Sequence, residues 1–175
     1  MIEIESCVFV PEEPPFLHRQ HFCIKDSTPW SCTPDSINPL YGHLFNIFTS
    51  APRGDAINSP LWFIFRGRGI ATYSEANILV HCNSGNYVSN LTPRHRNLPY
   101  PIVRGYLKVI DQGLKCLALD PDTNDSAIFR FTSQSSVINN SLHHLVPSKI
   151  VHFSAHLTKK HNGIVDLSVF YLHPN

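Results

Sequence analysis

The residues of this sequence best suited to nucleophilic chemistry lie between His81 and Gly85. A cysteine in a glycine-containing loop, as in His81-Cys82-Asn83-Ser84-Gly85, can attack phosphorus as a thiolate when an arginine later in the loop holds the phosphate oxygens. Val88 stands where that arginine would be needed, so the sequence provides no bidentate phosphate clamp. We interpret Cys82 as a cysteine at the end of a strand, and a hydrolase that uses Cys82 is kept as an alternative.

His156 and Asp166 are a second candidate pair. They lie on the two arms of a predicted β-hairpin that reverses at His161-Asn162-Gly163. If the hairpin is symmetric about His161, His156 faces Asp166, and the carboxylate favours the charged imidazole. The spacing therefore predicts a pH-sensitive pair, with an ordinary surface ion pair as the alternative.

One cluster contains ligand types suited to zinc, namely His18, His21, Cys23 and Cys32. Its spacing matches no standard zinc finger, and on a strand His18 faces away from His21 and Cys23. We predict no metal site and no cofactor, and zinc at these four residues is left open.

Two short basic segments could contact phosphates of RNA or of lipid headgroups. The first contains Arg66 and Arg68, and the second, an expected loop with three prolines, contains Arg94 and Arg96. No pattern of stacking aromatic residues accompanies them. They are our candidates for a nucleocapsid or lipid contact, although an ordinary surface also carries such loops.

Composition limits the class of protein. The chain has 175 residues, of which 42% are hydrophobic and 15% charged, and its formal net charge is +1. This indicates one folded domain with a nearly neutral surface, which favours self-association over strong electrostatic binding. The sequence has neither a run of about 18 apolar residues nor a signal peptide, so we expect a cytoplasmic protein that is not secreted by that route.

Alternation of apolar and polar residues predicts most of the fold. The segment from Lys149 to Tyr171 is typical of a long hairpin with one dry face, and the segment from Tyr106 to Leu119 predicts a second hairpin. A strand is expected from Ala127 to Thr132, followed by a short helix between Ser133 and Leu145. Apolar residues at three- and four-residue spacing from Ile37 to Phe48 predict an amphipathic helix.

These elements predict an α+β fold, with a mainly antiparallel sheet and one or two packed helices. The prolines near the N-terminus predict a flexible arm from residue 1 to 16, followed by a single domain from 17 to 175. The exposed residues of that arm are our candidates for self-association: Pro11, Pro14, Pro15 and Phe16.

The order of several segments resembles that of rhabdovirus matrix proteins, including the compact ones of plant rhabdoviruses. The resemblance rests on the proline arm, HFCIK, SCTPDS, NPLYGHLFNIFTS, LWFIF and the closing hairpin. It implies a structural protein that self-associates through its arm, bridges nucleocapsid and membrane, and is found in the host cytoplasm and the virion.

From the sequence we therefore expect a non-enzymatic assembly protein that binds copies of itself. The alternatives are a small β-rich binding or inhibitory module and, second, the hydrolase that uses Cys82.

Overall fold

A computed structural model describes most of the chain, and its described residues are 1–10, 16–18, 21–27, 30–32, 37–39, 45–51, 61–91, 101–112, 116–123 and 126–174. Only the backbone is described between 16 and 39. The chain divides into two compact units. The first, here called the barrel unit, consists of Met1–Glu3, Ile70–Ala76 and Ile102–Asn175, and the second unit consists of Ile4–Gly69 and Asn77–Pro101.

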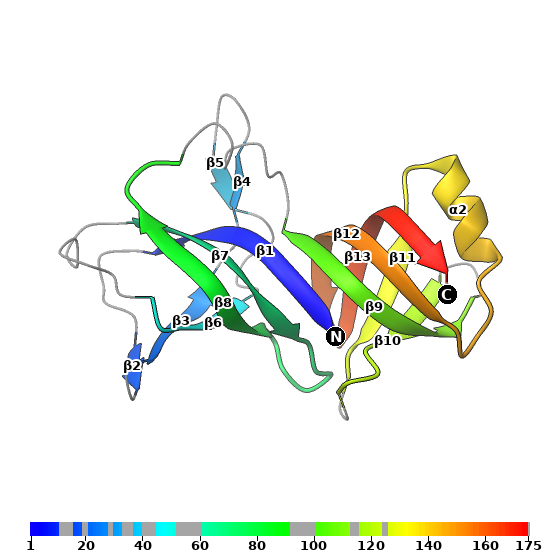
Figure 1. The fold of residues 1–175 in the computed structure, drawn as a ribbon, viewed down its shortest axis with the longest axis horizontal. Coiled ribbons are helices and arrows are strands. Elements are labelled where there is room, and N and C mark those ends of the chain that lie inside the picture. The colour runs from blue at the N-terminus through cyan, green and yellow to red at the C-terminus, as the bar shows by residue number, and fades with distance from the viewer. Residues whose placement is uncertain are drawn as a thin grey trace. The chain divides into compact units, whose positions relative to one another are not determined.

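Five strands form the barrel unit (Figure 1). They are β9 (Ile102–Asp111), β10 (Cys116–Leu119), β11 (Ile128–Thr132), β12 (Ile150–His161) and β13 (Ile164–Pro174). β9 pairs with β10, β10 with β11, β13 with β12, and β12 with β9, all antiparallel, while β11 pairs parallel with β13. Because each strand has two partners, the sheet closes into a five-stranded barrel.

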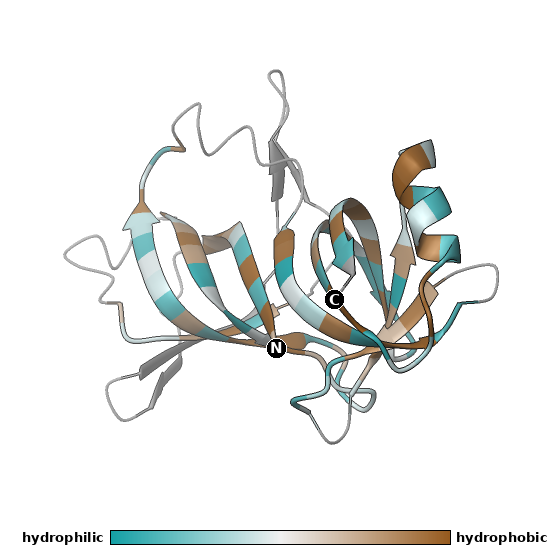
Figure 2. Ribbon diagram, turned by 45° about the vertical axis from the view of Figure 1, so that its right-hand side comes forward, coloured by the Kyte–Doolittle hydropathy of each residue, from teal (hydrophilic) through white to brown (hydrophobic). Residues whose placement is uncertain are grey.

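Alternation within each strand explains why this sequence closes into a barrel. Figure 2 shows the strands striped by hydropathy, with apolar and polar residues in turn. On β12, Val151, Phe153, Ala155 and Leu157 are all buried. They meet equally buried residues of the other strands, among them Phe131, whose ring lies 5.1 Å from that of Phe153. The interior is therefore a packed apolar core.

One helix, α2 (Ser136–His143), connects β11 to β12 and packs against β13. The Ser135 hydroxyl accepts a hydrogen bond from the Ile138 N–H and so caps its first turn. Leu142 is its buried residue, and Leu145, also buried, follows the helix. No helix among the described residues is long and apolar enough to cross a membrane.

The second unit contains a sheet in the order β1, β7, β8, β6, β3, β2 and a separate β4–β5 pair. The bounds are β1 (Ile2–Val10), β2 (Phe16–His18), β3 (His21–Ser27), β4 (Trp30–Cys32), β5 (Ile37–Pro39), β6 (Phe45–Thr49), β7 (Leu61–Ile70) and β8 (Ile78–Val88). The rings of Phe45 and Phe63 each pack on Phe65, at 5.8 and 5.9 Å. These three buried rings anchor the core of this unit.

The predicted α+β fold class is wrong. The described residues form mostly strands, five of them close into a barrel, and α2 is a short connection rather than a layer packed on an open sheet. The predicted single domain from 17 to 175 also differs from the two compact units, to both of which the first ten residues contribute.

The expected arm does not hold for residues 2 to 10, because Ile2–Val10 is strand β1. Ile2, Ile4, Val8 and Val10 are buried, so this segment is part of the core. The prolines that suggested an arm, from Pro11 to Pro15, lie outside the described residues. The proline-rich run does not prevent the residues before it from forming strand β1.

The amphipathic helix expected between 37 and 48 is also wrong, because the chain forms β5 and β6 there. Phe45, Ile47 and Thr49 are buried in alternation with Asn46 and Phe48. The apolar spacing fits both periods over so short a run, and parallel pairing with β8 selects the strand. Residues 40–44 lie outside the described part.

The two predicted hairpins and the strand from Ala127 are confirmed, as is the short helix, but the register of the last hairpin differs. His161 pairs with Ile164 across Asn162 and Gly163, whose φ angles are 47° and 73°. The reversal is centred between Asn162 and Gly163 rather than on His161, and an irregularity between Leu157 and Lys159 shifts the pairing once more. Leu157 therefore faces Leu167 rather than Val165. A shift of two residues preserves the dry face.

Candidate functional site

The outer face of three neighbouring barrel strands, β9, β12 and β13, carries the candidate site. Side chains that alternate with the buried ones point away from the barrel interior. The exposed apolar residues Ile110 and Ile150 are on this side. The aromatic and polar ones used here are Arg104, Tyr106 and Lys108 on β9, His152, Ser154 and His156 on β12, and Phe170, Tyr171 and His173 on β13. We call this set the outer face. It combines cations, imidazoles and aromatic rings.

Strand register arranges these residues in rows. Ser154 of β12 lies between Arg104 of β9 and Tyr171 of β13. His152 lies in the same way between Tyr106 and His173. The rows are about 7 Å apart along the strands, and the strands are about 5 Å apart. Each of these two rows therefore holds an aromatic ring and a basic or titratable group, whereas Lys108 lies opposite Ile150.

A β-bulge exposes two successive aromatic side chains on β13. Val169 faces Ala155, but the next pair joins Tyr171 to Ser154, so Phe170 is the extra residue. Strict alternation would turn Tyr171 inward, and the bulge keeps it outside instead. Phe170 is 46% exposed and Tyr171 53% exposed. Two large rings therefore lie on the surface, where a flat ligand could stack on them.

Ring contacts hold part of the outer face in place. The His156 ring lies 4.7 Å from that of Phe170, and the His152 ring lies 5.9 Å from that of Tyr106. Burial lowers the pKa of His156, which favours its neutral form. His152 and His173 are exposed, as is Lys108.

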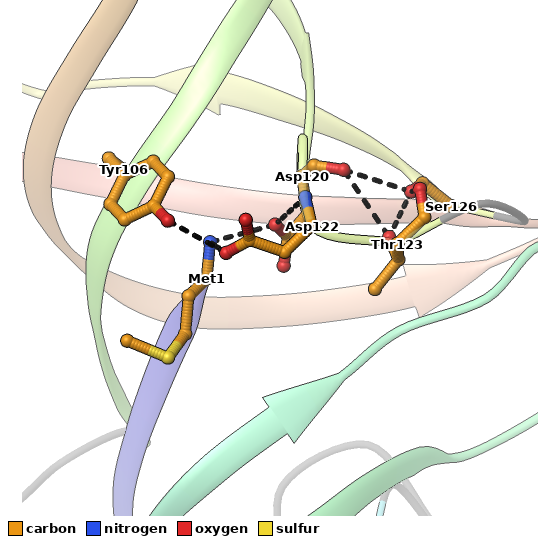
Figure 3. A network of polar contacts seen from close by, with 6 residues as sticks. All are labelled: Met1, Tyr106, Asp120, Asp122, Thr123 and Ser126. Carbon is orange, nitrogen blue, oxygen red and sulfur yellow. Dashed lines mark hydrogen bonds and ion pairs between the residues drawn. The ribbon is translucent and has the colours of Figure 1, made fainter.

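A polar network beside β9 fixes Tyr106 (Figure 3). Its hydroxyl donates to Oδ2 of Asp122 at 2.8 Å, and the Met1 ammonium lies 2.7 Å from the same oxygen. The ammonium also donates to Oδ1 of Asp120 at 2.7 Å. Asp120, 4% exposed, accepts from the Asp122 N–H, and its carbonyl accepts from the hydroxyls of Thr123 and Ser126. Tyr106 is therefore held in place by its hydroxyl while its ring remains on the outer face.

The predicted His156–Asp166 pair is not formed. His156 faces Ser168 and Ile102 across its two neighbouring strands, and Asp166 faces Lys159. The Asp166 carboxylate binds Arg130 instead. The changed register separates the pair, and the pKa of His156 moves down through burial rather than up through a carboxylate.

Arg66 and Arg68, predicted to contact a nucleocapsid or lipid, are exposed on β7 in the second unit. Gly67 lies between them against the His81 backbone, because a Cβ there would approach the His81 carbonyl oxygen to 2.5 Å. The exposed His81 ring stacks on Phe48, with centroids 5.4 Å apart. The two arginines therefore lie near an aromatic pair that the sequence had not indicated. Strand β7 continues through both arginines.

The other predicted site residues are not placed by the structure. Arg94, Arg96, Pro11, Pro14 and Pro15 lie outside the described residues, and only the backbone of Phe16 is described, at the start of β2. For the possible zinc ligands, His18, His21, Cys23 and Cys32, the structure likewise describes the backbone and not the side chains. Among the side chains that are described, no group of three or more histidine, cysteine or acidic residues could hold a metal ion.

Cys82 lacks the environment of a nucleophile. It is half-buried in β8, and its Sγ donates to the Ser84 carbonyl oxygen at 3.0 Å. Burial raises the pKa of the thiol, whereas an attacking cysteine needs a lowered pKa.

The residues of the outer face were missed because the sequence analysis considered clusters along the chain. Arg104, His152 and Tyr171 are far apart in sequence, and only strand pairing brings them together. The available signal was the polar position of each predicted strand.

The barrel defines the class of fold. Numbered within the barrel, the strands run in the order first, second, third, fifth, fourth and back to the first, with the helix between the third and the fourth. This is a closed five-stranded barrel that resembles the oligonucleotide/oligosaccharide-binding (OB) fold.

Solved structures support this assignment. The chain is similar to the wild-type single-stranded DNA binding protein from Thermus aquaticus, with a TM-score of 0.57 and 10% identity over 100% of this chain and 93% of that one. A deletion mutant of the same protein gives a TM-score of 0.57 and 11% identity over 100% and 94% of the two chains. No protein-family model matches the chain, and no curated protein matches it significantly. At such identity the likeness shows the fold alone.

Proposed function

We propose that this protein binds single-stranded nucleic acid without catalysing a reaction on it. The observation that carries the proposal is the outer face, where the aromatic rings of Tyr106, Phe170 and Tyr171 share rows or neighbouring positions with basic groups. Proteins that bind single strands stack bases on aromatic side chains and neutralise the phosphates with cations.

The fold supports the same class of ligand. OB folds commonly bind oligonucleotides, and the Thermus aquaticus neighbours are named for binding single-stranded DNA. In many OB folds the second and third strands form the binding surface. Here those strands are β10 and β11, whose outward residues include Leu117, Leu119 and the ion-paired Arg130. The aromatic and basic residues instead lie on the first, fourth and fifth strands.

A stacking mechanism also agrees with the charge of the chain. A net charge of +1 gives little long-range attraction to a duplex. The unpaired bases of a single strand expose faces on which Phe170 and Tyr171 can stack, each contributing about 1–3 kcal/mol. We therefore expect a preference for single strands over duplexes.

Fluorescence anisotropy with labelled oligonucleotides tests the proposal. The full chain should bind single-stranded DNA or RNA more tightly than a duplex of the same length, and Tyr171→Ala should weaken binding about 5-fold or more. Val137→Ala is the matched control, because Val137 is an exposed apolar residue on α2, outside the outer face. Equal affinity for single strands and duplexes, or equal effects of the two variants, would contradict the proposal.

Assembly through Pro11 to Phe16, and contact with a nucleocapsid or membrane as in a matrix protein, remain predictions from the sequence. They are compatible with nucleic-acid binding but do not depend on it.

A further inference from the structure

Two exposed histidines lie directly opposite each other on the last two barrel strands. His152 of β12 pairs with His173 of β13, and the neighbours of His152 along the chain, Val151 and Phe153, are buried. Residues that pair directly across two antiparallel strands point to the same side of the sheet, so both imidazoles lie on the outer face. Such a pair has its Cβ atoms about 4.5–5.5 Å apart.

This spacing suits two ligands of one metal ion. An imidazole nitrogen binds a divalent transition metal at about 2.0–2.1 Å, so two nitrogens on the same ion lie about 3 Å apart. Two histidines with directly opposed Cβ atoms reach that separation by a choice of side-chain rotamers, without any movement of the strands. His156 has no such partner, because Ser168 and Ile102 lie opposite it.

The surroundings of His152 limit how far the pair must reorganise. At this row β12 has a neighbour on each side, since His152 pairs with His173 and also with Tyr106 of β9. The His152 and Tyr106 rings lie 5.9 Å apart, and the Tyr106 hydroxyl is fixed by its hydrogen bond to Asp122. The backbone positions of both histidines are therefore set before an ion binds, which lowers the entropy cost of binding.

The ligand atoms determine which ions fit. Imidazole nitrogen suits Zn²⁺, Ni²⁺ and Cu²⁺, whereas Ca²⁺ and Mg²⁺ require oxygen ligands. Among the described side chains, no further histidine, cysteine or acidic residue joins the pair to make a group of three that could hold a metal ion. Two protein ligands leave the other coordination positions to water, so the ion would remain open to exchange with solvent.

We propose that His152 and His173 form a two-histidine site for a divalent ion of the late first transition row, with water as the remaining ligands. The site lies apart from the four possible zinc ligands between His18 and Cys32 that the sequence suggested. This inference goes beyond the proposed function and does not depend on it, because an ion can bind here with no nucleic acid present.

Isothermal titration calorimetry of the full chain with Ni²⁺, on protein that carries no polyhistidine tag, tests the site. Either His152→Ala or His173→Ala should weaken Ni²⁺ binding about 10-fold or more, since loss of a mere outer-shell partner of a metal ligand already has an effect of that size. His161→Ala is the matched control, because His161 is an exposed histidine of the same strand that pairs with Ile164. It should bind Ni²⁺ like the unchanged protein.

The variant that lacks both histidines shows whether they share one ion. If they do, it should bind Ni²⁺ about as weakly as either single variant, because one remaining imidazole holds the ion no better than any other exposed histidine. Two independent sites would instead leave, in each single variant, one site of unchanged affinity, and that result would overturn the proposal. Equal binding by the unchanged protein and His173→Ala would overturn it as well.

Thermal unfolding provides a second readout and a check on folding. Ni²⁺ should raise the Tm of the unchanged protein and of His161→Ala but not that of His152→Ala or His173→Ala, because only an ion held by the folded state stabilises it. Without metal all four proteins should melt alike, since the substituted side chains are exposed. A similar Ni²⁺-dependent rise in all four would place the ion elsewhere and contradict the proposal. No oligonucleotide enters these measurements, so their failure leaves the proposed function standing.

Discussion

Arg130 of β11 binds both carboxylate oxygens of Asp166, which lies directly opposite it on the parallel strand β13. Nη2 donates to Oδ2 at 2.7 Å, and Nε donates to Oδ1. The side chains are only 29% and 18% exposed. This fork also raises the pKa of the guanidinium, first through the hydrogen bond. It joins the two parallel strands of the barrel on their outer side.

Arg130→Ala should lower the free energy of unfolding by about 1–2 kcal/mol, because it removes two charge-assisted hydrogen bonds from a partly buried carboxylate. Arg130→Lys should recover only part of this loss, since an ammonium group cannot bind both oxygens as a fork. Urea unfolding measures both effects. Additive losses in a double-mutant cycle with Asp166→Ala would show that the pair contributes nothing.

Stability should fall as the pH falls because of His156. Burial lowers the pKa of this imidazole below its ordinary value of 6.5, so the unfolded chain takes up a proton more readily than the folded one. The contribution of neutral His156 to the free energy of unfolding is complete above about pH 6.5. It is lost as the pH falls toward the pKa that His156 has in the folded protein. His156→Phe, which keeps a ring beside Phe170, should unfold with a weaker dependence on pH between about 7.5 and 5. An unchanged dependence would assign the effect to other histidines.

The salt dependence of the binding constant should show how many phosphates the outer face contacts. For single strands, the logarithm of the binding constant falls with the logarithm of the salt concentration with a slope of about −0.7 per phosphate contacted. Arg104→Ala and Lys108→Ala should each reduce this slope by about 0.7 if each residue contacts one phosphate. Lys149→Ala is the control, because Lys149 lines a groove with α2 residues instead. Equal slopes in all three variants would show that neither Arg104 nor Lys108 contacts a phosphate.

Alkylation of Cys82 should be slow. Burial raises the pKa of its thiol, so less thiolate is present at neutral pH than for a free cysteine. Iodoacetamide labelling followed by mass spectrometry gives the rate at each cysteine across pH. Cys116, whose pKa burial raises to about 11, is an internal reference for an unreactive thiol. Labelling of Cys82 faster than that of free cysteine would restore the hydrolase alternative.

Local pattern was sufficient to predict the strands and turns of the barrel unit. Alternation predicted the hairpin and its dry face, in which Val151, Phe153 and Leu157 are buried, and turn chemistry predicted the reversal at Asn162-Gly163. Closure of the barrel was not predictable in the same way, because it depends on the parallel pairing of β11 with β13 and on the antiparallel pairing of β12 with β9. These pairings join residues distant in sequence, for which alternation carries no information.

The candidate site was less predictable than the fold. The Tyr171 side chain reaches the surface only because a bulge at Phe170 reverses the side to which it points. No residue type in β13 indicates that bulge. Charge clusters such as Arg66 and Arg68 were visible in the sequence, but the aromatic pair near them was not.

The parallel pair of β11 and β13 also constrains the order in which the barrel can fold during synthesis. β11 has β10 as a neighbour on one side, but its other edge stays open until the chain from Ile164 onward has been made. Until then the buried faces of Phe129 and Phe131 lack their final cover, and the open edge can pair with another chain. A ribosome that stalls between β12 and β13 would therefore present an aggregation-prone intermediate, which a chaperone could recognise by that edge.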